Sequence, residues 1–267
     1  MKYVVLSFDD GRRDFYVNAF PILMKYKLVA TLNVITDYVG KKNIREFASG
    51  NHECITWQNL NECAEMGIEI ANHSANHTND IFQIIKGQNS LAFRLNKKSE
   101  RIGFASPESE IFSKNFSAYK ELVKTGGVAY IRSGNQIKRD GCGYAVLYIL
   151  SRVTKNPLVF NLYNKRNIID IISAPKIDDW FYPSVTCSQE NSSKQVISFI
   201  ESIPDNNAAI IMFHSILNKR DPGWGKDKWF NSIDEFEDIC NYISNNTDVN
   251  AVTNQELHGI IFKNGGK

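Results

Sequence analysis

Short apolar runs rich in β-branched residues alternate with amphipathic segments along most of the chain. The apolar runs cover residues 3–8, 30–35, 68–73, 101–106, 128–133, 168–173, 208–214 and 249–253. Most of them are apolar throughout, which is typical of parallel strands covered on both faces. Helical periodicity marks the segments 21–28, 57–67, 116–127, 193–203 and 232–246. The alternation predicts an α/β fold, either a (β/α) barrel or an open parallel sheet.

Local signals mark where individual helices begin and end. Thr56 and Ser232 stand where N-caps are expected, and Gly67 and Gly126 stand where a helix ends. The stretch 136–167 is harder to assign, and its apolar centre predicts an inserted helix or hairpin. Because the chain has no evident linker, repeat or low-complexity segment, we expect a single domain over residues 1–267 with an insertion around 136–167.

Composition and charge argue against several classes of protein. The 267 residues carry a net charge of only +2, which argues against a nucleic-acid partner. No apolar run approaches the roughly 18 residues that a membrane-spanning helix needs. The first apolar run is short and ends at Asp9, unlike a signal peptide. The five cysteines form no close pair, which favours reduced thiols and a cytoplasmic location. If a signal peptide was removed, secretion or the cell envelope is expected instead, and the oligomeric state is not predicted.

Carboxylates and imidazoles gather at the predicted carboxyl ends of the strands. These residues are Asp9, Asp10, His73, His77 and His214. In a parallel barrel the carboxyl ends of the strands form one face, and active sites lie there. We therefore expect these side chains to converge, although they are distant in sequence.

The adjacent aspartates have two interpretations. The plain one is a helix N-cap with a solvated neighbour. In the functional interpretation the two carboxylates have different roles, since one binds a cation and the other remains free to act as a base. Two buried like charges raise each other's pKa, and a bound cation removes much of that repulsion.

The histidine pair in NHSANH adds a second signal. A spacing of four places both imidazoles on one side of a helical turn, a common arrangement of metal ligands, but it also occurs by chance on surfaces. Two histidines and one aspartate together are typical of a catalytic metal site with open positions. With Asp9 as base and His214 as proton donor to the leaving group, the set predicts metal-assisted hydrolysis of an amide or ester.

Five stretches, in order, resemble the motifs of the polysaccharide deacetylases, the NodB-homology group of carbohydrate esterase family 4. They are SFDDG (7–11), HSANH (73–77), FASP (104–107), DDW (178–180) and IIMFH (210–214). Further segments, such as ATLNVITDYVG and GGVAYIRSG, resemble the family between the motifs, so the resemblance covers nearly the whole chain. It implies an α/β fold of a particular kind, the distorted (β/α)7 barrel of the NodB/polysaccharide deacetylase type.

The resemblance also implies roles for the motif residues. The expected catalytic residues are Asp9 as base, His214 as general acid and Asp179 as a carboxylate that supports His214 or a neighbouring group, with Asp178 as its alternative. The expected ligands of a divalent metal, with zinc as the expected ion, are Asp10, His73 and His77. We interpret Arg132, within the family-like segment VAYIRS, as a structural residue.

The third and fourth motifs depart from the family pattern. Pro107 is present and the N–H of Glu108 is expected to hold the oxyanion, but Ala105 replaces the arginine that orients the base in many relatives. Glu108 replaces an aromatic residue. Its carboxylate either raises the pKa of Asp9, engages a cationic or amino-bearing substrate, or points to solvent. In the fourth motif, Lys176 stands where the family usually has an aspartate. Trp180 either forms an apolar wall that contacts the acyl methyl group or packs in the core. The loop 220–231, with two tryptophans, either contacts sugar or packs on the barrel.

The leading hypothesis is hydrolytic removal of an N-acetyl group from a sugar, in a polysaccharide or in its nucleotide-linked or lipid-linked precursor. An N-acetylated carbohydrate is then the expected partner. Two alternatives remain: a related non-peptide amide hydrolase such as a deformylase, and a catalytically impaired carbohydrate-binding barrel. The altered third motif supports the impaired barrel, and the intact base, ligand trio and His214 oppose it.

Overall fold

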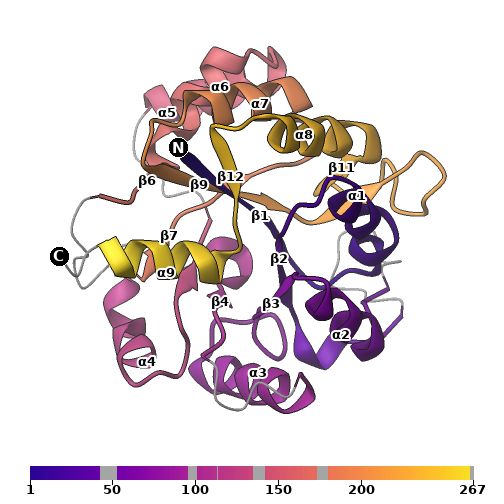
Figure 1. Ribbon diagram of the computed structural model, residues 1–267, viewed down its shortest axis with the longest axis vertical. Helices are drawn as coiled ribbons and strands as arrows, with labels where there is room; N and C mark the ends of the chain where they lie inside the picture. Colours follow the sequence, from indigo (N-terminus) through magenta and orange to yellow (C-terminus); the bar gives the residue numbers. More distant parts are fainter. Residues whose placement is uncertain (43–52, 96–100, 113, 135–141, 173–179, 265–267) are drawn as a thin grey trace.

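A parallel sheet that curves into a nearly closed barrel lies at the centre of the protein, and helices surround it (Figure 1). The computed structural model describes residues 1–42, 53–95, 101–112, 114–134, 142–172 and 180–264. The strands of the barrel are β1 (Lys2–Phe8), β2 (Thr31–Val34), β3 (Glu69–Asn72), β4 (Phe104–Ala105), β5 (Ile131–Arg132), β7 (Phe181–Tyr182), β8 (Val185–Thr186) and β9 (Asn207–Phe213). They pair in parallel in the order β8-β9-β1-β2-β3-β4-β5-β7.

The barrel closes through the segment 181–186, which pairs with both ends of this row of strands. β7 pairs with β5, and β8 pairs with β9 after a break at Pro183 and Ser184. One length of chain therefore acts as the seventh member of the ring. The prediction of a distorted (β/α)7 barrel is confirmed, and the break at Pro183 and Ser184 is one source of its distortion.

Four further strands of the described residues lie outside the ring. They are β6 (Ile169–Asp170), β10 (Ser215–Leu217), β11 (Phe230–Ser232) and β12 (Val249–Ala251). The apolar run 168–173 gives only β6, which pairs antiparallel with the start of β9 instead of joining the parallel ring. β1 occupies one side of β9, and β6 and β8 divide the other side, so β6 is left at an edge.

Helices cover the outside of the barrel (Figure 1). They are α1 (Phe20–Lys25), α2 (Trp57–Glu65), α3 (Ile81–Arg94), α4 (Lys120–Lys124), α5 (Cys142–Val153), α6 (Pro157–Asn164), α7 (Ser193–Ser202), α8 (Ile233–Asn245) and α9 (Asn254–Asn264). Shorter 3-10 or π segments are η1 (Phe15–Ala19), η2 (Thr36–Tyr38), η3 (Pro107–Ser109), η4 (Phe116–Tyr119) and η5 (Lys165–Asn167). The stretch 136–167 contains α5 and α6, and the expectation of a single domain stays a prediction.

The end signals of the helices act as the sequence indicates. Thr56 and Ser232 each accept a hydrogen bond from the backbone N–H three residues later, at 3.2 Å, and thereby cap α2 and α8. Gly67 and Gly126 have φ angles of 92° and 78°, the left-handed conformation that ends a helix. Local capping therefore fixes where these helices meet the strands.

Strand β1 shows how alternate residues serve the two sides of the barrel. Val4, Leu6 and Phe8 pack in the large apolar cluster between strands and helices. Val5 belongs to a second cluster inside the barrel, and Ser7 shares its inward side. The side that carries Ser7 continues past the strand to Asp9, so strand periodicity aims this carboxylate at the barrel axis.

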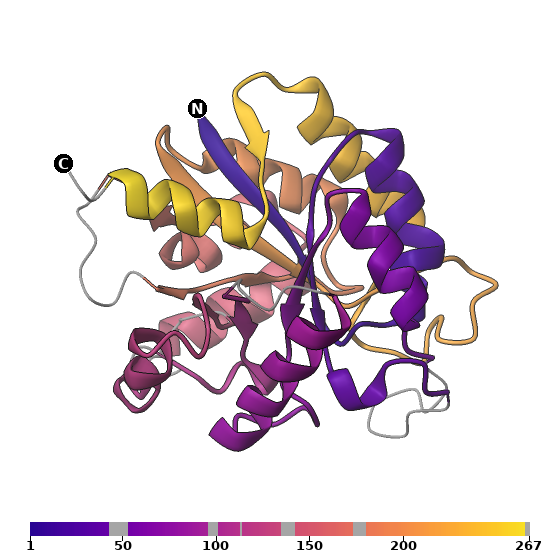
Figure 2. The same cartoon turned by 60° about the horizontal axis from the view of Figure 1, so that its bottom comes forward.

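Helix α9 covers the end of the barrel where the strands begin (Figures 1 and 2). Its first N–H groups donate to Thr31 Oγ1 at the start of β2 and to Glu69 Oε2 at the start of β3, both at 2.9 Å. Leu257 and Ile261 pack into the inner apolar cluster. This end of the barrel is therefore filled, and the opposite end carries the polar residues. Within the described part of the chain, no helix has the length and apolar character that crossing a membrane requires.

Helix α3 has a buried glycine, Gly87, where it crosses the end of β3. A Cβ atom at Gly87 would lie 2.4 Å from Asn72 Oδ1 and 2.9 Å from the backbone of Ser74. The helix therefore packs directly on the turn that follows β3. The helical periodicity did not predict α3, because a central glycine weakens the pattern.

We expect Gly87→Ala to destabilise the protein by about 1–3 kcal/mol, because the added methyl group overpacks this contact. Gly259→Ala is the matched control, since Gly259 is also inside a helix but a Cβ there meets nothing within 4 Å. The control should be neutral, or stabilise by about 0.5–1 kcal/mol through helix propensity. Urea unfolding measures both, and equal effects would contradict the close approach of α3.

Candidate active site

The turn after β1 brings both aspartates to the open end of the barrel. Asp10 has a φ of 74° and Gly11 a φ of 65°, so the chain leaves the strand through two consecutive left-handed residues. A left-handed aspartate is uncommon, and such conformations cluster at functional sites. A Cβ at Gly11 would also lie 3.3 Å from the side chain of Val34. Both carboxylates are buried as a result, at 4% and 3% exposure.

The two histidines lie on a tight turn rather than on the helical turn that the spacing predicts. Ser74 and His77 both have a φ of 63°, which no right-handed helix contains. Ser74 Oγ accepts a hydrogen bond of 2.9 Å from the N–H of Thr78 and stabilises the turn. The rings of His73 and His77 still come together, with centroids 5.1 Å apart.

Asp10, His73 and His77 form a cluster with the geometry of a metal site. The Nε2 atoms of both histidines lie 3.5 Å from Asp10 Oδ1, and one ligand atom from each residue falls within 4.8 Å of the others. His73 Nδ1 donates to the carbonyl oxygen of Ala105 at 2.9 Å, which leaves Nε2 facing Asp10 as an acceptor. One carboxylate and two imidazoles suit zinc or a similar divalent ion.

Arg12 holds the second oxygen of Asp10. Its Nε and Nη2 atoms lie 2.9 Å and 2.8 Å from Asp10 Oδ2. Burial opposes the charge of Asp10, but Arg12, His73 and His214 outweigh it and hold the pKa of Asp10 well below its usual range. The carboxylate is therefore ionised and oriented with Oδ1 toward the histidines.

Arg12 also connects this carboxylate to the loop before β11. It forms an ion pair with the buried Asp227 and donates to Ser215 Oγ at 2.9 Å. Asp227 Oδ1 in turn accepts from the N–H of Trp229 at 2.8 Å. A single guanidinium thus links the candidate metal site to the position of Trp229.

Asp9 is held by partners on two other strands. Arg132 on β5 is fully buried and forms an ion pair with Asp9 Oδ1, and Asn33 on β2 donates to the same oxygen at 2.8 Å. Burial alone would raise the pKa of Asp9, but Arg132 above all, with His73 and His214, holds it below its usual range. Asp9 is thus an ionised carboxylate inside the barrel. The interpretation of Arg132 as a structural residue misses this contact.

His214 follows β9 and reaches the same site. It interacts electrostatically with both Asp9 and Asp10, and its ring lies 5.6 Å from the ring of Trp229. Burial is the largest influence on the pKa of His214 and lowers it, although the two carboxylates oppose the shift. Its Nδ1 atom is buried and has no hydrogen-bond partner among the described residues.

The third motif lies beside the histidine turn. Pro107 is buried, whereas Glu108 is exposed and has a φ of 53°. Glu108 Oε1 lies 3.9 Å from His77 Nδ1, so the carboxylate borders the candidate metal site from the solvent side. The structure therefore places this unexpected residue at the rim of the site.

The fourth motif is placed only in part. Asp179 lies outside the described residues, as do Asp178 and Lys176. The side chain of Trp180 packs against a third apolar cluster, which contains Phe104 and Ile131. The packing interpretation predicts this contact, and the acyl-wall interpretation stays a prediction.

Four residues of the site were not assigned to it from the sequence. They are Arg12, Asn33, Arg132 and Asp227. A signal was available for Arg132, because a cation within an apolar strand must find a buried anion. Asn33 gives the same kind of signal, since a strand buried on both faces seldom carries an amide.

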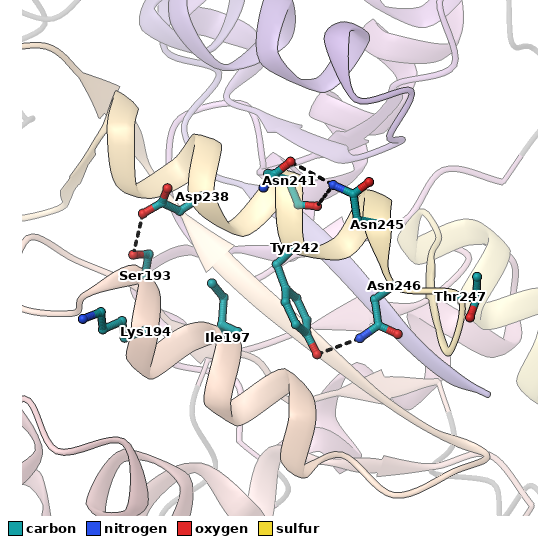
Figure 3. A pocket seen from close by; sticks show the side chains of 9 residues that line it. All are labelled: Ser193, Lys194, Ile197, Asp238, Asn241, Tyr242, Asn245, Asn246 and Thr247. Atoms are coloured by element: carbon teal, nitrogen blue, oxygen red, sulfur yellow. Dashed lines mark hydrogen bonds between the residues drawn. The ribbon is translucent and has the colours of Figure 1, made fainter.

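A separate groove of about 650 Å³ lies between α7 and α8, away from the barrel end (Figure 3). Its polar side chains bond mainly to one another, as Ser193 does to Asp238 at 3.0 Å and Asn246 to Tyr242 at 2.8 Å. Asn245 likewise bonds to Asn241 at 2.9 Å. The groove lacks the paired imidazoles and carboxylates of the barrel end, so we place the candidate active site at the barrel.

Comparison with known proteins finds a family similarity in the N-terminal part of the chain, which carries the two aspartates and the histidine pair. Residues 1–103 match a family model described as polysaccharide deacetylase. Over these residues the chain is similar to the polysaccharide deacetylase family. The matched range contains Asp9, Asp10, His73 and His77, and His214 lies beyond it. The resemblance seen in the motifs is therefore confirmed.

Individual relatives agree with the deacetylase assignment. A poly-β-1,6-N-acetyl-D-glucosamine N-deacetylase of Staphylococcus aureus is 31% identical over 158 residues, 58% of this chain and 51% of that protein. The chain thus spans about half the length of the curated relatives it matches. Two solved structures are also similar. IcaB from Ammonifex degensii is 22% identical, with a TM-score of 0.40. The match covers 48% of this chain and 58% of that one. A family 4 acetyl xylan esterase from Clostridium thermocellum is 16% identical, with a TM-score of 0.49. The match covers 97% of this chain and 91% of that one.

Removing the guanidinium of Arg132 should destabilise the protein strongly. We expect Arg132→Met to cost about 3–5 kcal/mol, because Asp9 is then buried without a countercharge. Arg13→Met is the matched control, since Arg13 is exposed and its pair with Glu53 contributes about 0–1 kcal/mol. Denaturant unfolding measures both variants.

The double variant Arg132→Met/Asp9→Asn separates charge from packing. Neutralising Asp9 should recover part of the stability lost in Arg132→Met, because no unpaired charge remains. Strict additivity of the two substitutions would show that Asp9 and Arg132 do not interact.

Proposed function

We propose that this protein is a metal-dependent hydrolase that removes the N-acetyl group from a sugar. The observation that carries the proposal is the convergence of two differently held carboxylates with three imidazoles at one end of a barrel of this family. The substrate is an N-acetylated carbohydrate, either a polysaccharide or its nucleotide-linked or lipid-linked precursor. The name of the Staphylococcus aureus relative favours an N-acetylglucosamine unit.

Asp10, His73 and His77 would hold the divalent metal, for which zinc fits the donor set. When bound, the metal supplies a Lewis acid that polarises the amide carbonyl and orients water. Arg12 keeps Asp10 ionised and turned toward the imidazoles. Glu108 adds a negative charge at the rim of the site, besides the buried Asp10, and this charge favours a cationic or amino-bearing substrate.

Asp9 acts as the general base. Its hydrogen bonds from Arg132 and Asn33 both end on Oδ1, so Oδ2 is the oxygen that accepts the proton of the attacking water. The lowered pKa of Asp9 keeps it ionised at neutral pH. Arg132 thus takes the orienting part that the resemblance gives to an arginine at position 105.

His214 acts as the general acid toward the leaving amine. Burial lowers its pKa, which makes the protonated imidazole a stronger proton donor. Asp179 is the proposed support of His214, and the N–H of Glu108, after Pro107, is proposed to hold the oxyanion. Trp229, beside His214, offers an apolar face on which a sugar ring stacks.

Two alternatives make different demands on the same residues. A related amide hydrolase such as a deformylase keeps the machinery and changes the acyl group. A catalytically impaired carbohydrate-binding barrel keeps sugar binding and loses turnover. The buried free thiols of Cys54, Cys63, Cys187 and Cys240 accord with the predicted cytoplasmic location, which favours a precursor over exported polymer.

Acetate release tests the proposal directly. Wild-type protein should release acetate from N-acetylglucosamine oligomers or nucleotide-linked N-acetyl sugars, and a chelator should abolish release. Asp9→Asn should lower the rate by about 10²–10⁴-fold, because the base is lost. Asp205→Asn, at an exposed ion pair, is the matched control and should not change the rate.

The outcomes separate the three hypotheses. Release that survives in Asp9→Asn would contradict the assigned base. Formate release from N-formyl sugars in place of acetate would favour the deformylase. Sugar binding without any release, in protein shown to hold metal, would favour the impaired barrel.

Substitution of Trp229 tests the proposed sugar contact. We expect Trp229→Ala to raise KM about 3–10-fold with a smaller effect on kcat, because a stacking face is worth about 0.5–1.5 kcal/mol. Trp224→Ala is the control, since Trp224 packs on Phe230 at 4.9 Å. Steady-state kinetics compare the two, and an equal KM in Trp229→Ala and wild type would exclude the contact.

A further inference from the structure

Helix α5 turns an apolar stripe toward solvent. Val146, Ile149, Leu150 and Val153 follow the spacing that puts residues on one helical face. Their exposed fractions are 51%, 56%, 40% and 77%. In a surface helix this face normally covers a core, yet among residues 145–153, whose side chains the structure describes, the buried residue is Ser151.

Helix α6 extends the exposed apolar surface. Leu158 and Leu162, one helical turn apart, are 70% and 61% exposed. The opposite side of α6 is anchored, since the ring of Phe160 lies 6.1 Å from that of Phe199 on α7. The hairpin of α5 and α6 is therefore fixed to the barrel through the contact of α6 with α7 (Figure 1). Aliphatic side chains are exposed on both of its helices.

The charges of the hairpin all have one sign. Residues 142–167 contain Arg152, Lys155, Lys165 and Arg166, and no aspartate or glutamate. Arg152 pairs with Glu190 at 2.6 Å, whereas Lys155 and Lys165 are exposed. The whole chain has a net charge of only +2, so acidic residues outnumber basic ones elsewhere. The hairpin itself is therefore basic, although Arg152 and Lys155 also interact with Glu190 and Glu235 of neighbouring segments.

We propose that the hairpin of α5 and α6 docks the protein on the surface of an anionic membrane. Exposed aliphatic side chains on a hairpin that contains lysine and arginine, and no aspartate or glutamate of its own, suit insertion at a lipid headgroup boundary. The 12 residues of α5 extend about 18 Å, too short to cross a hydrocarbon core of about 30 Å, so the helix lies in the plane of the surface.

A second copy of the chain fits the same surface less well. A two-fold contact through the hairpin places the same basic side chains opposite one another, without carboxylates of the hairpin to pair with them. Phosphate and glycerol headgroups supply the missing anions. The membrane proposal does not depend on the hydrolase activity.

Vesicle flotation tests the docking. The full chain is mixed with vesicles of phosphatidylcholine alone, or of equal parts phosphatidylcholine and phosphatidylglycerol. Wild type should float with the anionic vesicles only, and added salt should weaken the binding. Ile149→Gln/Val153→Gln should lower the partition coefficient at least about tenfold, because two apolar anchors are lost. Lys155→Glu/Lys165→Glu should abolish the preference for anionic lipid.

The matched control lies on another helix with exposed apolar residues. Phe82→Gln/Ile85→Gln removes side chains of α3 that are 70% and 41% exposed and should leave flotation unchanged. Thermal unfolding confirms that all variants remain folded. Absence of flotation in wild type, equal flotation of the α5 variant, or loss only in the α3 variant would overturn the proposal. A dimer that Ile149→Gln/Val153→Gln dissociates, without vesicle binding, would instead assign the surface to self-association.

Discussion

Two adjacent carboxylates stay ionised inside this barrel because each pairs with a different buried arginine. Asp10 is paired with Arg12 from its own turn, and Asp9 with Arg132 from β5 across the barrel. Without these cations, burial and mutual repulsion would raise both pKa values and neutralise at least one of the carboxylates. The two arginines also fix direction, because each takes one oxygen of its aspartate. The division of labour between neighbouring residues thus depends on the cation that each one meets.

This pairing depends in turn on how the barrel is closed. Arg132 reaches Asp9 because β5 lies across the ring from β1, with the segment 181–186 bridging β5 and β9. The short strands β4 and β5 supply few backbone hydrogen bonds of their own. Buried side-chain contacts across the barrel, including the ion pair of Arg132 with Asp9, therefore hold this side of the ring together.

The sequence was informative where residues act through local patterns. Strand ends, N-caps such as Ser232 and the motif residues of the barrel end were predicted, since each depends on neighbours along the chain. Contacts made across the barrel were not, and Arg132 was assigned to structure alone. The spacing of His73 and His77 predicted their proximity but the wrong backbone, because left-handed Ser74 and His77 leave no periodic signal. The edge position of β6 likewise could not be predicted, because it depends on how β6 and β8 share one side of β9, and the sequence of β6 alone does not show this.

The arginine counterions of the site also bear on the order of events during maturation. Many metalloproteins rely on their ion to neutralise clustered ligands, and they remain unfolded until it arrives. Here Arg12 pairs with Asp10, and with Asp227 as well, so the carboxylate of the candidate site has a countercharge that belongs to the chain itself. If the site holds an ion as proposed, that ion is not needed to neutralise Asp10. Such a chain would fold first and be loaded afterwards, and the ion that it carries would follow the supply in its surroundings.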